Sequence, residues 1–177
     1  MKVVVQNKGK ISLGRNHFVT SGGEGDIYAV DTRAFKIFSN SATVISSSKM
    51  DELKSIELSY IIKPEYLVLD TTGKPIGYEM TYISNAVPLC CLCTKSYRQR
   101  HGITISSIIK LIEQLRLGVE HLHEREILVV DLNEFNFLVG EEHSQLYFVD
   151  VDSYQTKLHP ATAIMDSVRD RLTPMND

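Results

Sequence analysis

The chain has 177 residues, which is enough to bury a sizeable core in one domain or in two small lobes. Hydrophobic residues make up 43% and charged residues 23%, as is typical of globular proteins, and a formal net charge of −3 argues against a general nucleic-acid-binding surface. No apolar run approaches the length of a membrane span, so a membrane is not expected as a partner. Because of the net charge, nucleic acid is not expected as a partner either.

Two features of the sequence indicate the compartment. The N-terminal run MKVVVQNKGKISLG soon turns polar and does not resemble a signal peptide. The cysteines Cys90, Cys91 and Cys93 crowd into one stretch, with no other cysteine to complete a zinc site or a second disulfide. We expect them to be reduced and mostly small buried side chains, which predicts a cytoplasmic location. A redox or metal role is the less favoured alternative.

The first part of the chain, up to about residue 83, is rich in strand-like runs separated by polar turns. These runs are VVVQN, FVT, DIYAV, AFKIF, EYLVLD and IGYEMTYI. The turn between Asp70 and Lys74 predicts a hairpin. One helix is expected after the Ser-rich stretch SNSATVISSS, because Met50, Leu53 and Ile56 recur at three-residue spacing. Residues 1–83 are therefore predicted to form a five-stranded antiparallel sheet with one helix.

From residue 84 onward the pattern becomes mainly helical. The segment 103–124, ITISSIIKLIEQLRLGVEHLHE, carries a broad apolar face, and Thr104 or Ser106 can cap its start. The apolar residues of this face are Ile105, Ile108, Ile109, Ile112, Leu115, Val119 and Leu122. The short runs ILVV, FNFLV and LYFVDVD follow and predict a loop and a short hairpin. The fold class is thus α+β, with a second, mainly helical domain over 84–177.

A glycine-rich segment, TSGGEGDIY, lies between two predicted strands. Gly22, Gly23 and Gly25 would let backbone amides approach a phosphate closely, as in a loop that covers a nucleotide. The segment resembles G-x-G-x-x-G-x-V at Gly22, Gly25 and Ile27, with Thr20 in the place of the first glycine. A glycine-rich hairpin turn without a ligand explains the same residues and is the simpler reading of this motif alone.

A lysine follows in the strand AFKIF, where its neighbours are apolar. Lys36 would need an anion if it points into a core, and the phosphates of a nucleotide are one candidate. A lysine on an edge strand that faces water is the alternative, and it is the favoured reading when this motif is taken by itself.

The run VVDLNEFNFLV raises a similar choice. Asp131 and Asn136 are polar residues between two apolar runs, and they indicate either a turn between strands or a metal-assisted catalytic loop. The strand LYFVDVD then ends at Asp150, where a Mg²⁺-binding aspartate would lie. A turn aspartate explains either site singly, whereas the order of glycine turn, core lysine, D-x-x-x-x-N and terminal aspartate favours the catalytic interpretation.

This order of motifs resembles the protein kinase-like superfamily over residues from about 10 to 160. Within it, GGEGDIY, AFKIF, DLNEFN and VDVDSYQ are similar to an atypical bacterial and phage group of kinase-like proteins. The resemblance implies a two-lobed kinase-like fold that binds ATP and Mg²⁺, in the host cytoplasm if the protein is phage-encoded. The expected N-lobe is the five-stranded antiparallel sheet with its helix, and the expected C-lobe is mainly helical and incomplete.

The resemblance also assigns roles to individual residues. Lys36 would be held by a glutamate on the following helix, for which Glu52 is preferred over Glu57, although a solvated glutamate on the helix face is nearly as good an explanation. Asp131 would orient the phosphate acceptor, while Asn136, Asp150 and Asp152 would bind Mg²⁺. The adenine would lie against Met80 and contact the main chain at Thr81 and Ile83, near a hinge at residues 80–84.

Several positions depart from the pattern of the family. Val129 and Val130 replace the usual histidine and arginine before the catalytic aspartate, and Asn133 replaces the lysine of Ser/Thr kinases. Glu24 places a carboxylate in the phosphate-covering loop, which would repel phosphate unless a metal or a base offsets it.

The C-terminal lobe is expected to be truncated, because residues 153–177 contain no long apolar helix. These residues are predicted to pack poorly or to lean on a partner, and bare apolar surface on the long helix is expected to favour self-association. Two functions remain open: an ATP-dependent protein kinase-like phosphotransferase, of Ser/Thr or atypical type, that acts on a protein substrate, and a pseudokinase or regulatory module that acts through a protein partner.

Overall fold

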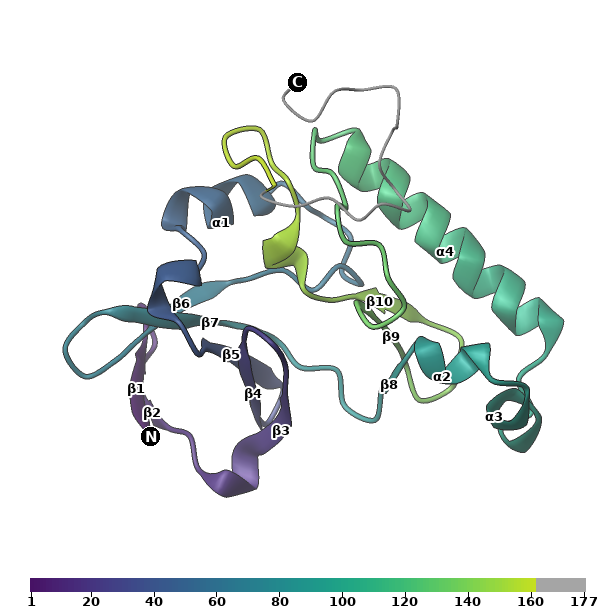
Figure 1. Cartoon of the computed structure of the whole chain (residues 1–177), viewed down its shortest axis with the longest axis horizontal. Helices are drawn as coiled ribbons and strands as arrows, with labels where there is room; N and C mark the ends of the chain where they lie inside the picture. The colour runs from purple at the N-terminus through teal and green to yellow at the C-terminus, as the bar shows by residue number, and fades with distance from the viewer. Residues whose placement is uncertain (162–177) are drawn as a thin grey trace. The chain divides into compact units, whose positions relative to one another are not determined.

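The computed structural model describes residues 1–161, which form two compact units (Figure 1). The first unit comprises residues 1–55 and 62–85, and the second comprises residues 56–61 and, of the described residues, 86–161.

The first unit is built on a curled seven-stranded sheet in the order β2-β1-β6-β7-β5-β4-β3 (Figure 1). Every neighbouring pair is antiparallel. The strands are β1 (Lys2–Val5), β2 (Gly9–Ser12), β3 (Phe18–Ser21), β4 (Gly25–Val30), β5 (Arg33–Phe38), β6 (Tyr66–Leu69) and β7 (Pro75–Thr81). Two 3₁₀ turns, η1 (Arg15–His17) and η2 (Ser41–Thr43), and the helix α1 (Ser47–Leu53) complete the unit.

The two faces of this sheet carry different side chains because residues alternate along each strand. One face holds a core cluster formed by Val3, Val5, Leu13, Phe35 and Val68. Lys36 follows Phe35 directly along β5, so it lies on the opposite face of the sheet. On that face it is paired in register with Ile27 of β4 and Tyr78 of β7.

The second unit contains one long helix and a small sheet. Its elements are β8 (Val87–Pro88), α2 (Cys90–Cys93), α3 (Lys95–Arg100), α4 (Ile105–His123), β9 (Phe137–Val139), β10 (Leu146–Phe148) and the 3₁₀ turn η3 (Val151–Ser153). The sheet order is β10-β9-β8. α4 runs beside the β9–β10 hairpin (Figure 1), and a Cβ atom added to Gly118 would lie 2.4 Å from the Phe148 ring, so this contact requires glycine.

The expected five-stranded N-lobe with a mainly helical C-lobe is wrong. The hairpin β1–β2 extends the sheet to seven strands, because β1 pairs with β6 and buries Val3 and Val5 in the core. Lys8, in the turn of that hairpin, reaches the buried Glu79 on β7, with 2.5 Å between Nζ and Oε1. After residue 86, the apolar runs that follow α4 form a three-stranded sheet with β8, where helices were expected to dominate.

Several local predictions are confirmed. Thr104 caps α4 by accepting a hydrogen bond from the Ser107 amide at 3.1 Å. The turn at Asp70 closes with Gly73 at a φ of +90°, as its residues indicate. IGYEMTYI pairs with the strand that contains AFKIF, and the last two apolar runs form the β9–β10 hairpin. The predicted helix at Met50 ends at Leu53, before Ile56.

The prediction that residues 153–177 pack poorly is wrong for the beginning of that segment. Tyr154 and Thr156 are buried, and Gln155 exchanges two backbone hydrogen bonds with Leu128. Residues 162–177, to which the same prediction applied, lie outside the described residues. Within residues 1–161, no helix combines the length and the hydropathy that crossing a membrane would require.

Candidate functional site

The glycine-rich segment forms the tight connection between β3 and β4. The Gly22 amide donates to the Gly25 carbonyl at 2.8 Å, and the Ser39 amide donates to the Glu24 carbonyl at 2.9 Å. A Cβ atom at Gly25 would lie 2.1 Å from the backbone oxygen of Ile37, whereas one at Gly23 would have no neighbour within 4 Å. Gly25 is therefore required by strand packing, and Gly23 is the glycine of this segment with open space on its Cβ side.

These surroundings predict different costs for two matched substitutions. Gly25→Ala is expected to destabilise the fold by about 3 kcal/mol, because the methyl group meets rigid backbone. Gly23→Ala is expected to change stability by less than about 0.5 kcal/mol. Urea unfolding of both variants measures the difference, and equal midpoints would contradict the close approach of β4 and β5.

Lys36 is a buried cation on β5. Only 6% of the residue is exposed, and its Nζ lies 4.9 Å from the centroid of the Phe38 ring. Glu24 reaches it from the β3–β4 turn, with 2.8 Å between Nζ and Oε2. The Glu24 side chain is 58% exposed, so the buried charge is neutralised by a carboxylate that can move into solvent. The sequence predicted that the Glu24 carboxylate would repel phosphate unless a base offsets it, and Lys36 is such a base beside it.

Glu52, the predicted partner of Lys36, lies in α1 of the same unit. It is half-buried, and its Oε1 atom is shielded from solvent. Ile27 lies on β4 directly opposite Lys36 in the register of the sheet. The pair Lys36–Glu52 stays a prediction, and Glu24 is a partner that the sequence did not assign.

The predicted adenine-contacting residues follow one another at the end of β7. Met80 is paired with Ala34 and is half-buried, while Thr81 is exposed and donates its hydroxyl to Glu65 at 2.9 Å. Ile83 follows the strand and is half-buried.

The loop that contains Asp131 and Asn136 belongs to the second unit and is closed by its own side chains. The Asn136 amide donates to the Asp131 carboxylate at 2.8 Å and to the Asp131 backbone oxygen at 3.0 Å. Asn133 donates to the other oxygen of the same carboxylate at 2.8 Å. The side-chain amides of Asn133 and Asn136 therefore fix the orientation of the Asp131 carboxylate. Asn133 stands at the position where the resemblance to Ser/Thr kinases predicts a lysine.

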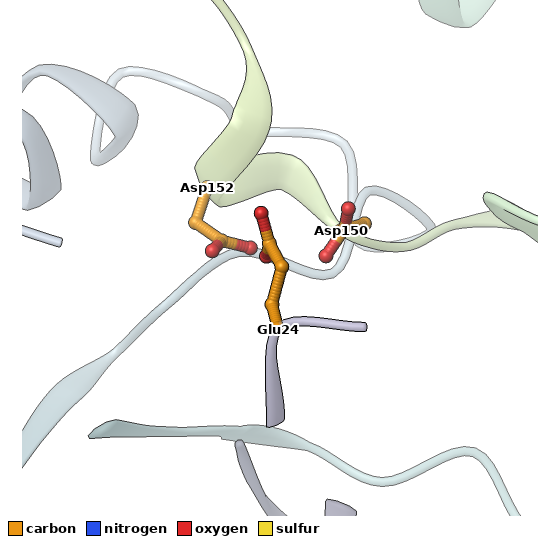
Figure 2. Close-up of side chains that lie close together, drawn as sticks. All are labelled: Glu24, Asp150 and Asp152. Atoms are coloured by element: carbon orange, nitrogen blue, oxygen red, sulfur yellow. The ribbon is translucent and has the colours of Figure 1, made fainter. Parts of the chain in front are cut away.

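Asp150 and Asp152 follow β10, on a turn joined to the same loop. The Val149 amide donates to the Asn136 backbone oxygen at 3.0 Å, because β9 and β10 pair at this end. Asp150 adopts a left-handed conformation with a φ of 59°, and its carbonyl accepts from the Ser153 amide and hydroxyl. Figure 2 shows the two carboxylates at the start of this turn, and it also shows Glu24 of the first unit.

A buried tyrosine reports on the charge around this turn. Tyr154 is 1% exposed, and its hydroxyl has no hydrogen-bond partner within residues 1–161. Burial raises the pKa of Tyr154 well above its usual value, and the carboxylates of Asp150, Asp152 and Asp131 raise it further. Three carboxylates of the second unit therefore act on one buried phenol, which indicates that each of them lies near Tyr154.

The structure brings the predicted residues together within each unit. Lys36, Ile27 and the glycine turn share one end of the first unit, and Asp131, Asn136 and Asp150 are linked by the β9–β10 hairpin in the second. The sequence interpretation missed Glu24 as a partner of Lys36, Asn133 as a support of Asp131, and Tyr154. The signal in the sequence for Tyr154 is an aromatic residue two positions after Asp152 in VDVDSYQ.

Comparisons with protein-family models and with curated protein sequences give no match.

Proposed function

We propose that the protein binds ATP with Mg²⁺ and transfers phosphate to a protein substrate, with the motifs that resemble the kinase-like superfamily as its chemical groups. The observation that carries this proposal is the hydrogen-bonded link between the D-x-x-x-x-N loop and Asp150. Asn136 binds Asp131 through its side chain and Val149 through its backbone oxygen, so an acceptor-orienting carboxylate and metal-binding oxygens occur in one rigid segment.

Lys36 and the glycine turn are assigned to the phosphates. A buried ammonium strengthens its attraction for phosphate because surrounding apolar groups exclude water. Glu24 satisfies this ammonium in the absence of nucleotide and, being largely exposed, can leave it without becoming a buried unpaired charge. Gly23 has open space on its Cβ side, where a phosphate can approach. The Gly22 amide donates to the Gly25 carbonyl and would have to leave that bond to reach a phosphate. Glu52 supports Lys36 from α1 in this proposal.

Asp131 is assigned to the phosphate acceptor, and Asp150 and Asp152, which follow β10, are assigned to Mg²⁺. Asn133 and Asn136 hold the Asp131 carboxylate, so that it can accept a hydrogen bond from the acceptor hydroxyl in a fixed direction. Asn136, Asp150 and Asp152 supply the oxygen ligands that Mg²⁺ prefers. Asp150 and Asp152 both raise the pKa of the buried Tyr154, which supports their being near one another. Bound Mg²⁺ would neutralise phosphate charge. Met80, Thr81 and Ile83 are assigned to the adenine.

The role of Asp131 gives a direct test of phosphotransfer. Asp131→Asn is expected to leave ATP affinity within about twofold and to lower turnover at least about a hundredfold, because the residue orients the acceptor and does not hold the nucleotide. Transfer of labelled γ-phosphate to protein, or ATP hydrolysis, measures turnover. Unchanged turnover in the variant would contradict the assignment, and Asp31→Asn serves as an exposed control.

A pseudokinase or regulatory binding module is the second candidate. Asn133 stands where a phosphate-neutralising lysine would be, and Lys36 has a carboxylate partner without any nucleotide. A parent protein that binds ATP but shows no transfer to any protein in the presence of Mg²⁺ would favour this function, in which a protein partner takes the place of a substrate.

We also propose self-association through α4 and a cytoplasmic location, for which the free cysteines are the support. Ile105, Ile109 and Ile112 are 80%, 60% and 58% exposed and share one face of the helix. Ile109→Glu is expected to shift a concentration-dependent dimer to monomer in sedimentation experiments. A parent chain that stays monomeric at high concentration would exclude this contact.

A further inference from the structure

A cluster of two histidines and a tyrosine joins α3 to the β9–β10 hairpin in the second unit. Tyr97 lies in α3, His101 caps the end of that helix, and His143 lies in the hairpin turn with a φ of 52°. The Tyr97 and His101 rings stack at 4.2 Å between centroids. The two imidazole rings are 5.3 Å apart, and the Tyr97 hydroxyl lies 3.2 Å from His143 Nε2.

The separation of the imidazoles matches a shared metal ion. Zinc binds an imidazole nitrogen at about 2.0–2.1 Å, which puts the ion about 3.2 Å from the ring centroid. Two centroids 5.3 Å apart then subtend an angle of about 110° at the ion, close to the tetrahedral value. The separation therefore suits a single ion with one nitrogen from each ring.

The hydrogen bond between the Tyr97 hydroxyl and His143 Nε2 provides a second, independent indication. Metal-binding histidines commonly bond their other ring nitrogen to a neighbouring oxygen, which fixes the tautomer and the ring orientation. If His143 donates from Nε2 to the Tyr97 hydroxyl, the lone pair lies on Nδ1 and is available to a metal. The Tyr97–His101 stack restricts the orientation of the second ring.

We propose that His101 and His143 bind a borderline transition-metal ion such as Zn²⁺, with Tyr97 as the positioning residue of His143. His101 is exposed, so the ion can enter from solvent, and water molecules complete its coordination. Imidazole nitrogen suits zinc, copper and nickel, while Mg²⁺ and Ca²⁺ prefer oxygen. The bound ion would link α3 to the turn of the hairpin whose other end carries Asn136 and Asp150.

Calorimetric titration of the untagged, metal-free chain with Zn²⁺ tests this proposal. One ion is expected to bind with a dissociation constant on the order of 10 µM, and Mg²⁺ is expected not to bind at these residues. His101→Asn and His143→Asn should each weaken zinc binding at least about tenfold. Asparagine tolerates the positive φ of residue 143, and circular dichroism confirms that each variant is folded.

Two matched controls exclude other ligands. His123→Asn changes an exposed histidine on α4, and Cys93→Ser changes the exposed cysteine of α2, so both should keep zinc affinity within about twofold. Co²⁺ bound in place of zinc should show no sulfur-to-metal charge-transfer band. Zinc binding that survives both histidine substitutions, or that is lost with Cys93→Ser, would overturn the proposal, as would the absence of binding to the parent chain. ATP takes no part in this experiment, so its result is separate from the nucleotide proposal.

Discussion

Asp150→Asn is expected to abolish the Mg²⁺ dependence of ATP binding. The substitution removes one charged oxygen ligand, and with it at least about tenfold in metal affinity, while it keeps the size of the side chain. Asparagine also tolerates the left-handed backbone at this position, where φ is 59°, so the fold should be retained. ATP affinity measured with and without Mg²⁺ should differ in the parent and be equal in the variant.

Asp31→Asn is the matched control for this change. Asp31 also has a positive φ, of 54°, and is exposed on the first unit. It should retain the full Mg²⁺ dependence. If Asp150→Asn keeps the same dependence as the parent, Asp150 is not a metal ligand, and the proposed Mg²⁺ site is wrong.

Lys36→Met is expected to weaken ATP at least about tenfold, both with and without Mg²⁺, and Lys36→Ala should do the same at a larger cost in packing. The ammonium acts on phosphate directly, and burial makes its charge count for more than that of a surface lysine. Methionine retains the length that packs against Phe38 and Tyr78. Glu24 is left in solvent and not buried, so the loss of stability should be small.

Two further variants separate the role of Lys36 from a general effect of charge. Lys10→Met removes an exposed lysine of β2 and should leave affinity unchanged. Glu24→Gln removes the carboxylate that competes with phosphate for Lys36, and it should strengthen ATP binding. Weaker ATP binding in Glu24→Gln would show that Glu24 supports the nucleotide and does not compete with it.

The fold could be predicted from the sequence where local chemistry decides it. Thr104 begins α4 and Gly73 closes its turn because a cap and a positive φ need those residue types. The β1–β2 hairpin could not be predicted as part of the sheet, since β2 reads GKIS and is largely polar. Its place depends on pairing with β6 and on Lys8 reaching Glu79, contacts between residues far apart in sequence.

In the candidate site, too, local features could be predicted from the sequence, whereas contacts that depend on the folded chain could not. The order of the motifs favoured a buried Lys36, although its apolar neighbours in AFKIF alone did not exclude a lysine facing water. Asp131 and Asn136 could be paired from their spacing. The contact of Lys36 with Glu24 could not be predicted, because it depends on how the glycine turn brings that side chain back over β5. Asn133 was considered only as a missing lysine, although its amide can hold the Asp131 carboxylate directly.

Titration of the parent chain with ATP, in the presence and absence of Mg²⁺, tests nucleotide binding most directly. We expect saturable binding that Mg²⁺ strengthens, accompanied by a rise in the thermal unfolding midpoint that grows with ATP concentration. If ATP neither binds nor shifts the midpoint under either condition, the parent chain has no working nucleotide site, and the charges around Lys36 and Asp150 serve structure or a protein partner.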